Sequence, residues 1–200
     1  MDLKQHKKYY YVMRKYRNVP VITVDDDVIY QPYMVGQLYW THLANKEYIV
    51  CGRCDKMTRD ESGKIQEMSK WEELVPIPKC KDKDLFGIGI GGILYPYIVN
   101  QVIDDKFVEL INCVKSDDCL MFIVSRGLGL KYMTVDIDSS CNRIGGMGFL
   151  GKEPLPYGHD EKALWVINKT RNYKNIYIKY FDGFYNPDSF LHAIKSERRT

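Results

Sequence analysis

The chain has 200 residues, a length that fits one domain with its own core. Its 29 Lys and Arg against 26 Asp and Glu give a net charge of only +3, which argues against a nucleic-acid partner bound through bulk positive charge. No apolar run approaches the roughly 20 residues of a membrane span, and residues 1–8 do not form a secretory signal, so we expect a soluble cytoplasmic protein.

The first quarter of the chain alternates between predicted helices and strands. Apolar residues at helical spacing predict a helix over residues 3–17. The β-branched run 21–24 predicts a strand buried on both faces, which ends in three consecutive Asp, 25–27. A proline suited to a first helical turn opens a second helix over 32–45, and 47–51 is the next expected strand.

The middle of the chain is richer in turn signals. The Asp-Glu-Ser-Gly sequence at 60–63 predicts a turn between two short strands, and 71–84 is expected to be irregular. In residues 86–96 glycines alternate with Ile and then double, which indicates backbone approached closely by a ligand or by another segment. A helix over about 103–112 should follow.

The next segment carries a complete set of helix signals. Ser116 is a good N-cap for an apolar helix that reaches about Leu128, with Asp117 and Asp118 in a first turn favoured by the helix dipole. Gly129 should end this helix. A strand is then expected over 131–135.

The last quarter of the chain is expected to begin with a long mobile loop. Residues 145–158 hold the glycines and prolines of that loop, 160–173 predict a helix and 176–181 a last strand. Strands and helices alternate along the whole chain. The predicted fold class is therefore α/β with a mainly parallel or mixed sheet.

The three carboxylates after the first strand need a positive partner if they are not solvated. Ligands of open α/β sheets bind beyond the carboxyl ends of strands. Because alternate residues of an extended backbone point the same way, Asp25 and Asp27 could face one cleft and hold Mg²⁺ or Mn²⁺ against phosphate oxygens. A solvated acidic turn is the alternative.

A second pair of carboxylates lies at the predicted N-terminus of a helix. The dipole keeps Asp117 and Asp118 ionised there, which suits a general base or a charge-stabilising anion. A helix with a favourable first turn is the alternative. Arg53 is a candidate partner for a phosphate or for the Asp cluster, with a surface ion pair as its alternative.

Cys51 and Cys54 have the spacing of half a zinc site. The chain has 6 Cys and 4 His, but the remaining cysteines form no second pair and the histidines are scattered. Without an export signal, reduced cysteines used as small apolar residues are the simpler interpretation.

Five segments, in this order, resemble the bacterial family-2-like glycosyltransferases of the GT-A fold that build surface polysaccharides. The sequence V-I-T-V-D-D-D-V-I-Y resembles a strand with a DxD motif, and the glycine run resembles a G-x-G-G-x-L-Y-P loop between donor and acceptor. The segments are residues 21–30, 48–53, 70–71, 87–96 and 116–120, the last followed by Gly129 as in the family's acidic pair and helix. The resemblance covers about residues 5–135 and, more loosely, the chain to 181.

This resemblance implies a Rossmann-like GT-A sheet and a metal-dependent transfer of a sugar from a nucleotide-sugar donor to a glycan or lipid-linked acceptor. Asp27 and Asp25 would bind Mn²⁺ or Mg²⁺ at the donor's diphosphate, and Asp26 would also lie at the donor. Asp118 would be the general base of an inverting enzyme, while Asp117 would orient the acceptor or the base.

The resemblance also implies roles for residues around these carboxylates. Arg53 stands where the family has an arginine at the end of a strand. Gly91 and Gly92 would let the backbone approach the sugars.

The sequence departs from the family at its start, because no βαβ segment that cradles a nucleotide base precedes Asp25. We therefore expect one N-terminally shortened GT-A domain over 1–200, with its core at 1–144 and a loop, helix and strand at 145–200. A non-catalytic remnant or partner-dependent subunit is one alternative, and a zinc-stabilised interaction module built on Cys51 and Cys54 is another. Association with a partner enzyme, or with the inner face of a membrane, is also open.

Overall fold

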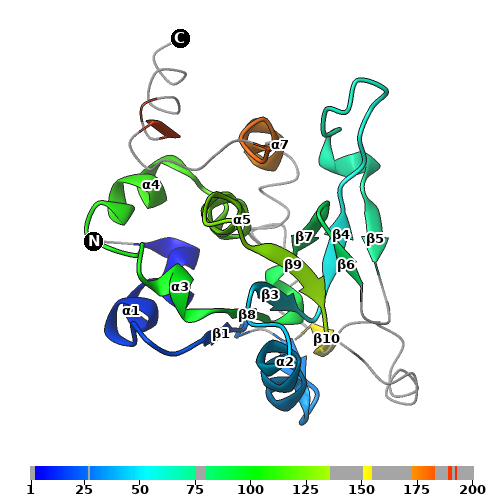
Figure 1. Cartoon of the computed structure of the whole chain (residues 1–200). Helices are drawn as coiled ribbons and strands as arrows, with labels where there is room; N and C mark the ends of the chain where they lie inside the picture. Colours follow the sequence, from blue (N-terminus) through cyan, green and yellow to red (C-terminus); the bar gives the residue numbers. More distant parts are fainter. Residues whose placement is uncertain are drawn as a thin grey trace.

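The computed structural model describes residues 3–26, 28–74, 80–135, 151–154, 173–182, 189, 190 and 192, which form a mixed α/β fold (Figure 1). Its largest sheet has the strand order β1-β8-β3-β9-β6, and these strands span Val21–Thr23, Ile93–Tyr95, Tyr48–Cys51, Lys131–Thr134 and Lys81–Asp82. β3 and β9 are parallel, whereas the other neighbouring pairs are antiparallel. The predicted α/β class with a mixed sheet is confirmed.

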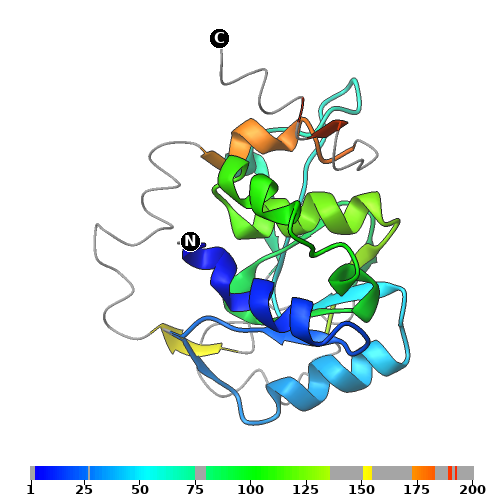
Figure 2. The same cartoon turned by 90° about the vertical axis from the view of Figure 1, so that its left-hand side faces the viewer.

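Helices cover both faces of this sheet. They are α1 Lys7–Lys15, which follows the 3₁₀ turn η1 Lys4–His6, then α2 Met34–Leu43, α3 Tyr97–Asn100, α4 Phe107–Cys113, α5 Asp117–Gly127 and α7 Tyr173–Ile178. Figures 1 and 2 show α2 on one face of the sheet and α5 on the other. Within the described stretches, no helix is long and apolar enough to cross a membrane.

The two faces of the sheet form two apolar cores, because successive strand residues point in opposite directions. Val50 and Leu94 pack with Met34 and Leu38 of α2 in the smaller core. Ile49, the neighbour of Val50, belongs to the larger core on the opposite face. The alternation of apolar side chains along single strands thus places one helix layer on each side.

Two smaller β-structures complete the fold. One is a sheet of order β5-β4-β7, and the other is the antiparallel pair β10–β2. Their strands span Glu72–Leu74, Cys54–Lys56, Leu85–Gly87, Gly151–Pro154 and Val28–Tyr30, and two more 3₁₀ turns, η2 and η3, span Met68–Lys70 and Gly89–Gly91.

An aromatic cluster joins these layers around Phe86 of β7, whose side chain is 0% exposed. Its ring centroid lies 5.0 Å from that of Phe122 in α5, 5.5 Å from that of Phe181 and 5.3 Å from that of Trp71. Four rings from distant parts of the chain therefore make one contiguous core.

The predicted helix signals of α5 are confirmed. The Ser116 side chain accepts a hydrogen bond from the backbone N–H of Cys119 at 3.3 Å, as an N-cap does. Gly129 has a φ of +76°, the left-handed conformation that ends helices. Both ends of α5 are thus fixed by local chemistry.

Three expectations for irregular structure or strands are wrong. The run at 176–181 is not a strand: α7 continues to Ile178 and a turn follows, because the buried side chains Tyr177, Ile178 and Phe181 share one helical face. Residues 151–154 of the expected mobile loop form β10, and the expected irregular stretch 71–84 contains β5 and β6. The helix expected over 160–173 lies outside the described residues, apart from its last residue.

Candidate functional site

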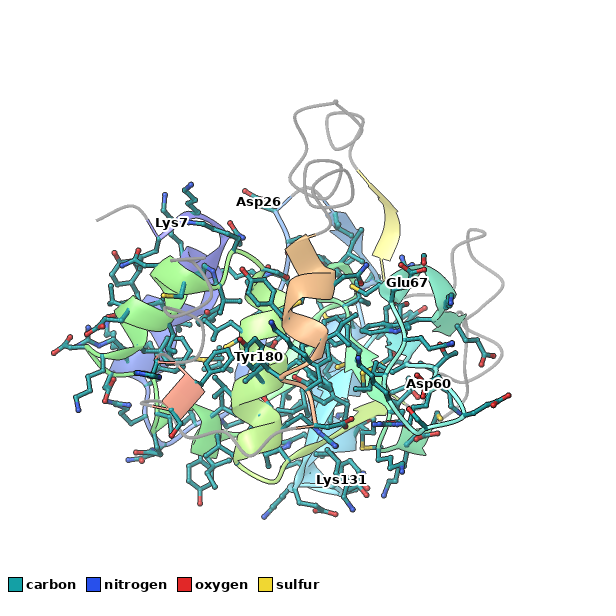
Figure 3. All side chains as sticks on the ribbon, turned by 90° about the horizontal axis from the view of Figure 1, so that it is seen from above. Lys7, Asp26, Asp60, Glu67, Lys131 and Tyr180 are labelled. Carbon is teal, nitrogen blue, oxygen red and sulfur yellow. The ribbon has the colours of Figure 1, made fainter. Side chains whose placement is uncertain are left out.

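The carboxyl ends of β1 and β3 lie at one edge of the large sheet, because both strands run antiparallel to β8. The last residue of each pairs with Ile93, the first residue of β8. Asp25 therefore follows β1 at the edge where Arg53 follows β3. Lys131, which begins β9, lies on the opposite side of the molecule from Asp26 (Figure 3). This edge is where ligands of α/β sheets bind.

Asp25 and Asp26 begin the connection from β1 to β2. The backbone N–H of Asp25 donates a hydrogen bond of 2.9 Å to the Tyr30 hydroxyl, which links Asp25 to the end of β2. The Asp25 side chain is 29% exposed, whereas Asp26 is exposed at the surface (Figure 3). Asp27, the first expected metal ligand, lies outside the described residues.

The second pair of carboxylates, Asp117 and Asp118, occupies the first turn of α5 as expected. Only 14% of the Asp117 side chain is exposed. The N-terminal end of the helix dipole favours the charged form of both groups. The two acidic sites predicted from the sequence, at Asp25 and at Asp117, are far apart along the chain.

Lys8 of α1 connects the two acidic sites. Its Nζ lies 3.0 Å from Asp25 Oδ1 and 2.6 Å from Asp117 Oδ2. Burial lowers the pKa of Lys8, but the charges of Asp117, Asp118 and Asp25 outweigh this effect and raise that pKa above its ordinary value. The Lys8 ammonium is therefore a cation that meets the strand-end carboxylate of Asp25.

The η3 turn forms the wall of the site beside Lys8. A Cβ added to Gly89 would lie 2.9 Å from Lys8 Nζ and 3.0 Å from Asp118 Oδ1. A larger residue at this position would push against both charged groups. Gly89 therefore gives Lys8 and Asp118 room to lie together.

The neighbouring glycines pack against the end of β3. A Cβ on Gly91 would lie 2.4 Å from the Arg53 backbone nitrogen, and Gly92 has a φ of +77°. The Gly92 carbonyl accepts a hydrogen bond of 2.9 Å from the Gly52 N–H, and the Ile88 N–H donates to the Arg53 carbonyl at 3.1 Å. The close approach expected at these glycines is made by residues 52–53, and their expected contact with sugars stays a prediction.

The structure therefore brings together Asp25, Asp117 and Asp118 around Lys8, with η3 and the end of β3 beside them. Sequence reasoning missed Lys8 and Gly89. The only sequence signal for Lys8 is its place in the helix expected just before the acidic strand end. This signal is weak, because lysines on helices are usually solvated.

Cys51 and Cys54 are buried and carry free thiols. Burial, followed by the hydrogen bond and charge of Cys54, raises the pKa of Cys51 well above its ordinary value in the metal-free protein. In the described part of the chain, no three His, Cys, Asp or Glu side chains group as a metal site.

Carboxylate oxygens are the donors that Mg²⁺ and Mn²⁺ prefer, so the chemistry of Asp25 fits such an ion. Its Oδ1 faces Lys8, and a divalent cation there would need additional oxygens. Water molecules are one ordinary source of such oxygens.

Comparisons of the chain with protein-family models, with curated proteins and with solved structures found no match.

Proposed function

We propose that this protein is a GT-A-type glycosyltransferase, which moves a sugar from a nucleotide-sugar donor to a glycan or lipid-linked acceptor. One observation supports this most: the carboxylates after β1 and at the start of α5 lie around one ammonium. Lys8 Nζ is 3.0 Å from Asp25 and 2.6 Å from Asp117. The resemblance assigns the first carboxylate to the donor and the second to the acceptor, and a transferase needs both at one place.

In this proposal, Asp25 and Asp27 hold Mn²⁺ or Mg²⁺. When bound, the cation supplies Lewis-acid stabilisation of the departing nucleoside diphosphate. Asp26 contributes at the donor's ribose or at metal-bound water. Asp118 accepts the proton of the acceptor hydroxyl, and Asp117 orients the acceptor or the base.

The remaining predicted residues belong to the proposed donor pocket. Arg53 lies at the carboxyl end of β3, where its positive charge would favour a phosphate. Gly91 and Gly92 shape the turn beside it through the backbone contacts described above. Because they have no side chains, we propose that they let the backbone of this turn approach the donor sugar closely.

A non-catalytic or partner-dependent GT-A subunit is the second candidate function, and nucleotide binding distinguishes the two. Titration calorimetry with UDP, GDP, CDP and dTDP, with and without Mn²⁺, should show binding of one nucleotide that Mn²⁺ strengthens. Absence of binding by all four would refute the transferase proposal for this chain. Zinc analysis of the purified protein tests the interaction module, which requires stoichiometric zinc.

Two variants test the proposed roles once a nucleotide binds. Asp27→Ala should abolish the effect of Mn²⁺ on binding. Asp118→Asn should keep nucleotide binding but stop release of the nucleoside diphosphate from its sugar donor in the presence of acceptor. Asp105→Asn is the matched control, because the Asp105 side chain is 87% exposed in an ion pair with Arg14. Full activity of Asp118→Asn would exclude Asp118 as the base.

Peripheral association with a membrane or a partner enzyme is part of the same proposal. Helix α2 supports it, because Met34–Leu43 contains no Lys, Arg, Asp or Glu. On its outer side Val35, Tyr39 and Trp40 are 56%, 43% and 70% exposed. Co-sedimentation with anionic vesicles, compared between the natural chain and Trp40→Ala, measures the membrane part of the proposal.

A further inference from the structure

Lys8 belongs to a helix that is anchored in the large core. Three residues of α1, Tyr9, Tyr10 and Met13, are buried in the large core. Lys8 itself extends from the same helix into the acidic site, where its side chain is 24% exposed. The ammonium is thus tethered within a few ångströms of its carboxylate partners.

The position of this ammonium conflicts with a metal ion at Asp25. A divalent cation binds carboxylate oxygens at about 2.0–2.6 Å. With Lys8 Nζ 3.0 Å from Asp25 Oδ1, a cation bound to this same oxygen would lie only about 5 Å or less from the ammonium. Two like charges at such a distance repel each other strongly.

We propose that the Lys8 ammonium is the resident cation of the Asp25–Asp117 pair and competes with divalent cations for Asp25. The inference rests on the proposed function, which supplies the reason to expect a cation there. Lys8 has to release only Asp25 to admit the ion, because its shorter contact, 2.6 Å, is with Asp117. Metal entry therefore requires a side-chain movement and no unfolding of α1.

The size of the effect follows from Coulomb's law. For a charge of +2 at about 5 Å from a charge of +1, the repulsion lowers metal affinity by more than tenfold even at the dielectric constant of water. In the partly buried site the dielectric constant is lower and the loss is larger. Removing the ammonium should therefore increase affinity by at least about tenfold.

The test measures Mn²⁺ binding by electron paramagnetic resonance in the full chain without nucleotide. Lys8→Met should bind Mn²⁺ at least about tenfold more tightly than the natural chain. Lys7→Met is the matched control, because Lys7 is the preceding residue of α1 and is exposed (Figure 3). The proposal is overturned if Lys8→Met binds no more tightly than the natural chain.

Two further measurements separate charge from folding. Lys8→Arg retains a cation and should keep the natural affinity, whereas a gain equal to that of Lys8→Met would overturn the proposal. Adding Asp25→Asn to Lys8→Met should abolish the gain, because Asp25 is the ligand being uncovered. A gain that persists in this double variant would also overturn the assignment.

The natural chain offers a test without substitution. Saturating Mg²⁺ should increase the rate at which an N-hydroxysuccinimide ester acetylates Lys8, followed by mass spectrometry, while the rate at Lys7 stays constant. An unchanged Lys8 rate would contradict release of Asp25. These measurements do not depend on nucleotide binding, so the two proposals can fail separately. A gain in Mn²⁺ affinity for Lys8→Met supports the competition even where no nucleotide binds, and nucleotide binding supports the transferase even where Lys8→Met gains no affinity.

Discussion

His6 should make the stability of this protein depend on pH between 7 and 4. The imidazole is 2% exposed and lies between α1 and the end of α4. Its Nε2 is 3.0 Å from the Val114 carbonyl, which can only accept, and its Nδ1 is 2.6 Å from the Tyr9 hydroxyl. Nε2 therefore carries the proton of the neutral ring, and in that tautomer Nδ1 accepts a hydrogen bond from the Tyr9 hydroxyl.

The magnitude follows from the pKa of this imidazole. Burial lowers the pKa of His6 from 6.5 to about 4, although Asp117 and the Val114 carbonyl partly oppose the change. The unfolded chain binds a proton at His6 near pH 6.5, whereas the folded chain binds it only near pH 4. The stability that depends on a neutral His6 is present above pH 6.5 and is lost as the pH falls toward 4. The free energy of unfolding should therefore drop by about 3 kcal/mol over this range.

Urea denaturation at pH 7, 6, 5 and 4 provides the assay. Other groups titrate in this range, so the informative quantity is the difference in pH slope between the natural chain and His6→Gln. The natural chain should lose about 3 kcal/mol more than His6→Gln between pH 7 and pH 4. His192→Gln, at an exposed histidine, should keep the natural slope. Equal slopes for the natural chain and His6→Gln would refute the neutral buried imidazole.

Two paired substitutions test the packing by urea denaturation. Gly91→Ala should destabilise the protein by about 1–3 kcal/mol, because its Cβ would meet the Arg53 backbone nitrogen at 2.4 Å. In α2, the Cβ of Gly36→Ala would meet nothing within 4 Å, so this substitution should stabilise the protein by about 0.5–1 kcal/mol. Equal effects would contradict the close approach at η3. Phe86→Ala should lower the free energy of unfolding by about 3–5 kcal/mol, whereas Trp40→Ala should lower it by less than about 0.5 kcal/mol, because the Trp40 side chain is 70% exposed. A small loss of stability for Phe86→Ala would contradict the aromatic core.

Elements with strong local signals could be predicted from the sequence. The helix that contains α5 has an N-cap at Ser116 and a stop at Gly129, and both signals act within a few residues. β5 and β6 were missed because strands of three and two residues have too little periodicity to detect. A short apolar run such as 176–181 fits the period of a strand as well as that of a helix. Only the packing of its buried residues, Phe181 among them, shows that it is helical up to Ile178.

The candidate site was predicted in its parts but not in its assembly. Asp25, Asp117 and Asp118 were identifiable because carboxylates at a strand end and at a helix start have specific electrostatic reasons to be there. Lys8 was not, since its partners are remote in sequence and nothing local distinguishes it from the exposed Lys7. A cation that balances remote anions is a property of the tertiary structure.

The register of β8 explains why these parts meet. Ile93 of β8 pairs with the last residues of β1 and β3, so the η3 turn just before it is carried to the carboxyl ends of both strands. Gly89 thereby reaches Lys8 and Asp118. A slip of one residue would turn Leu94 from the α2 core to the opposite face and move η3 away from the acidic groups. The apolar alternation of β8 therefore fixes its register, and this register sets the geometry of the site.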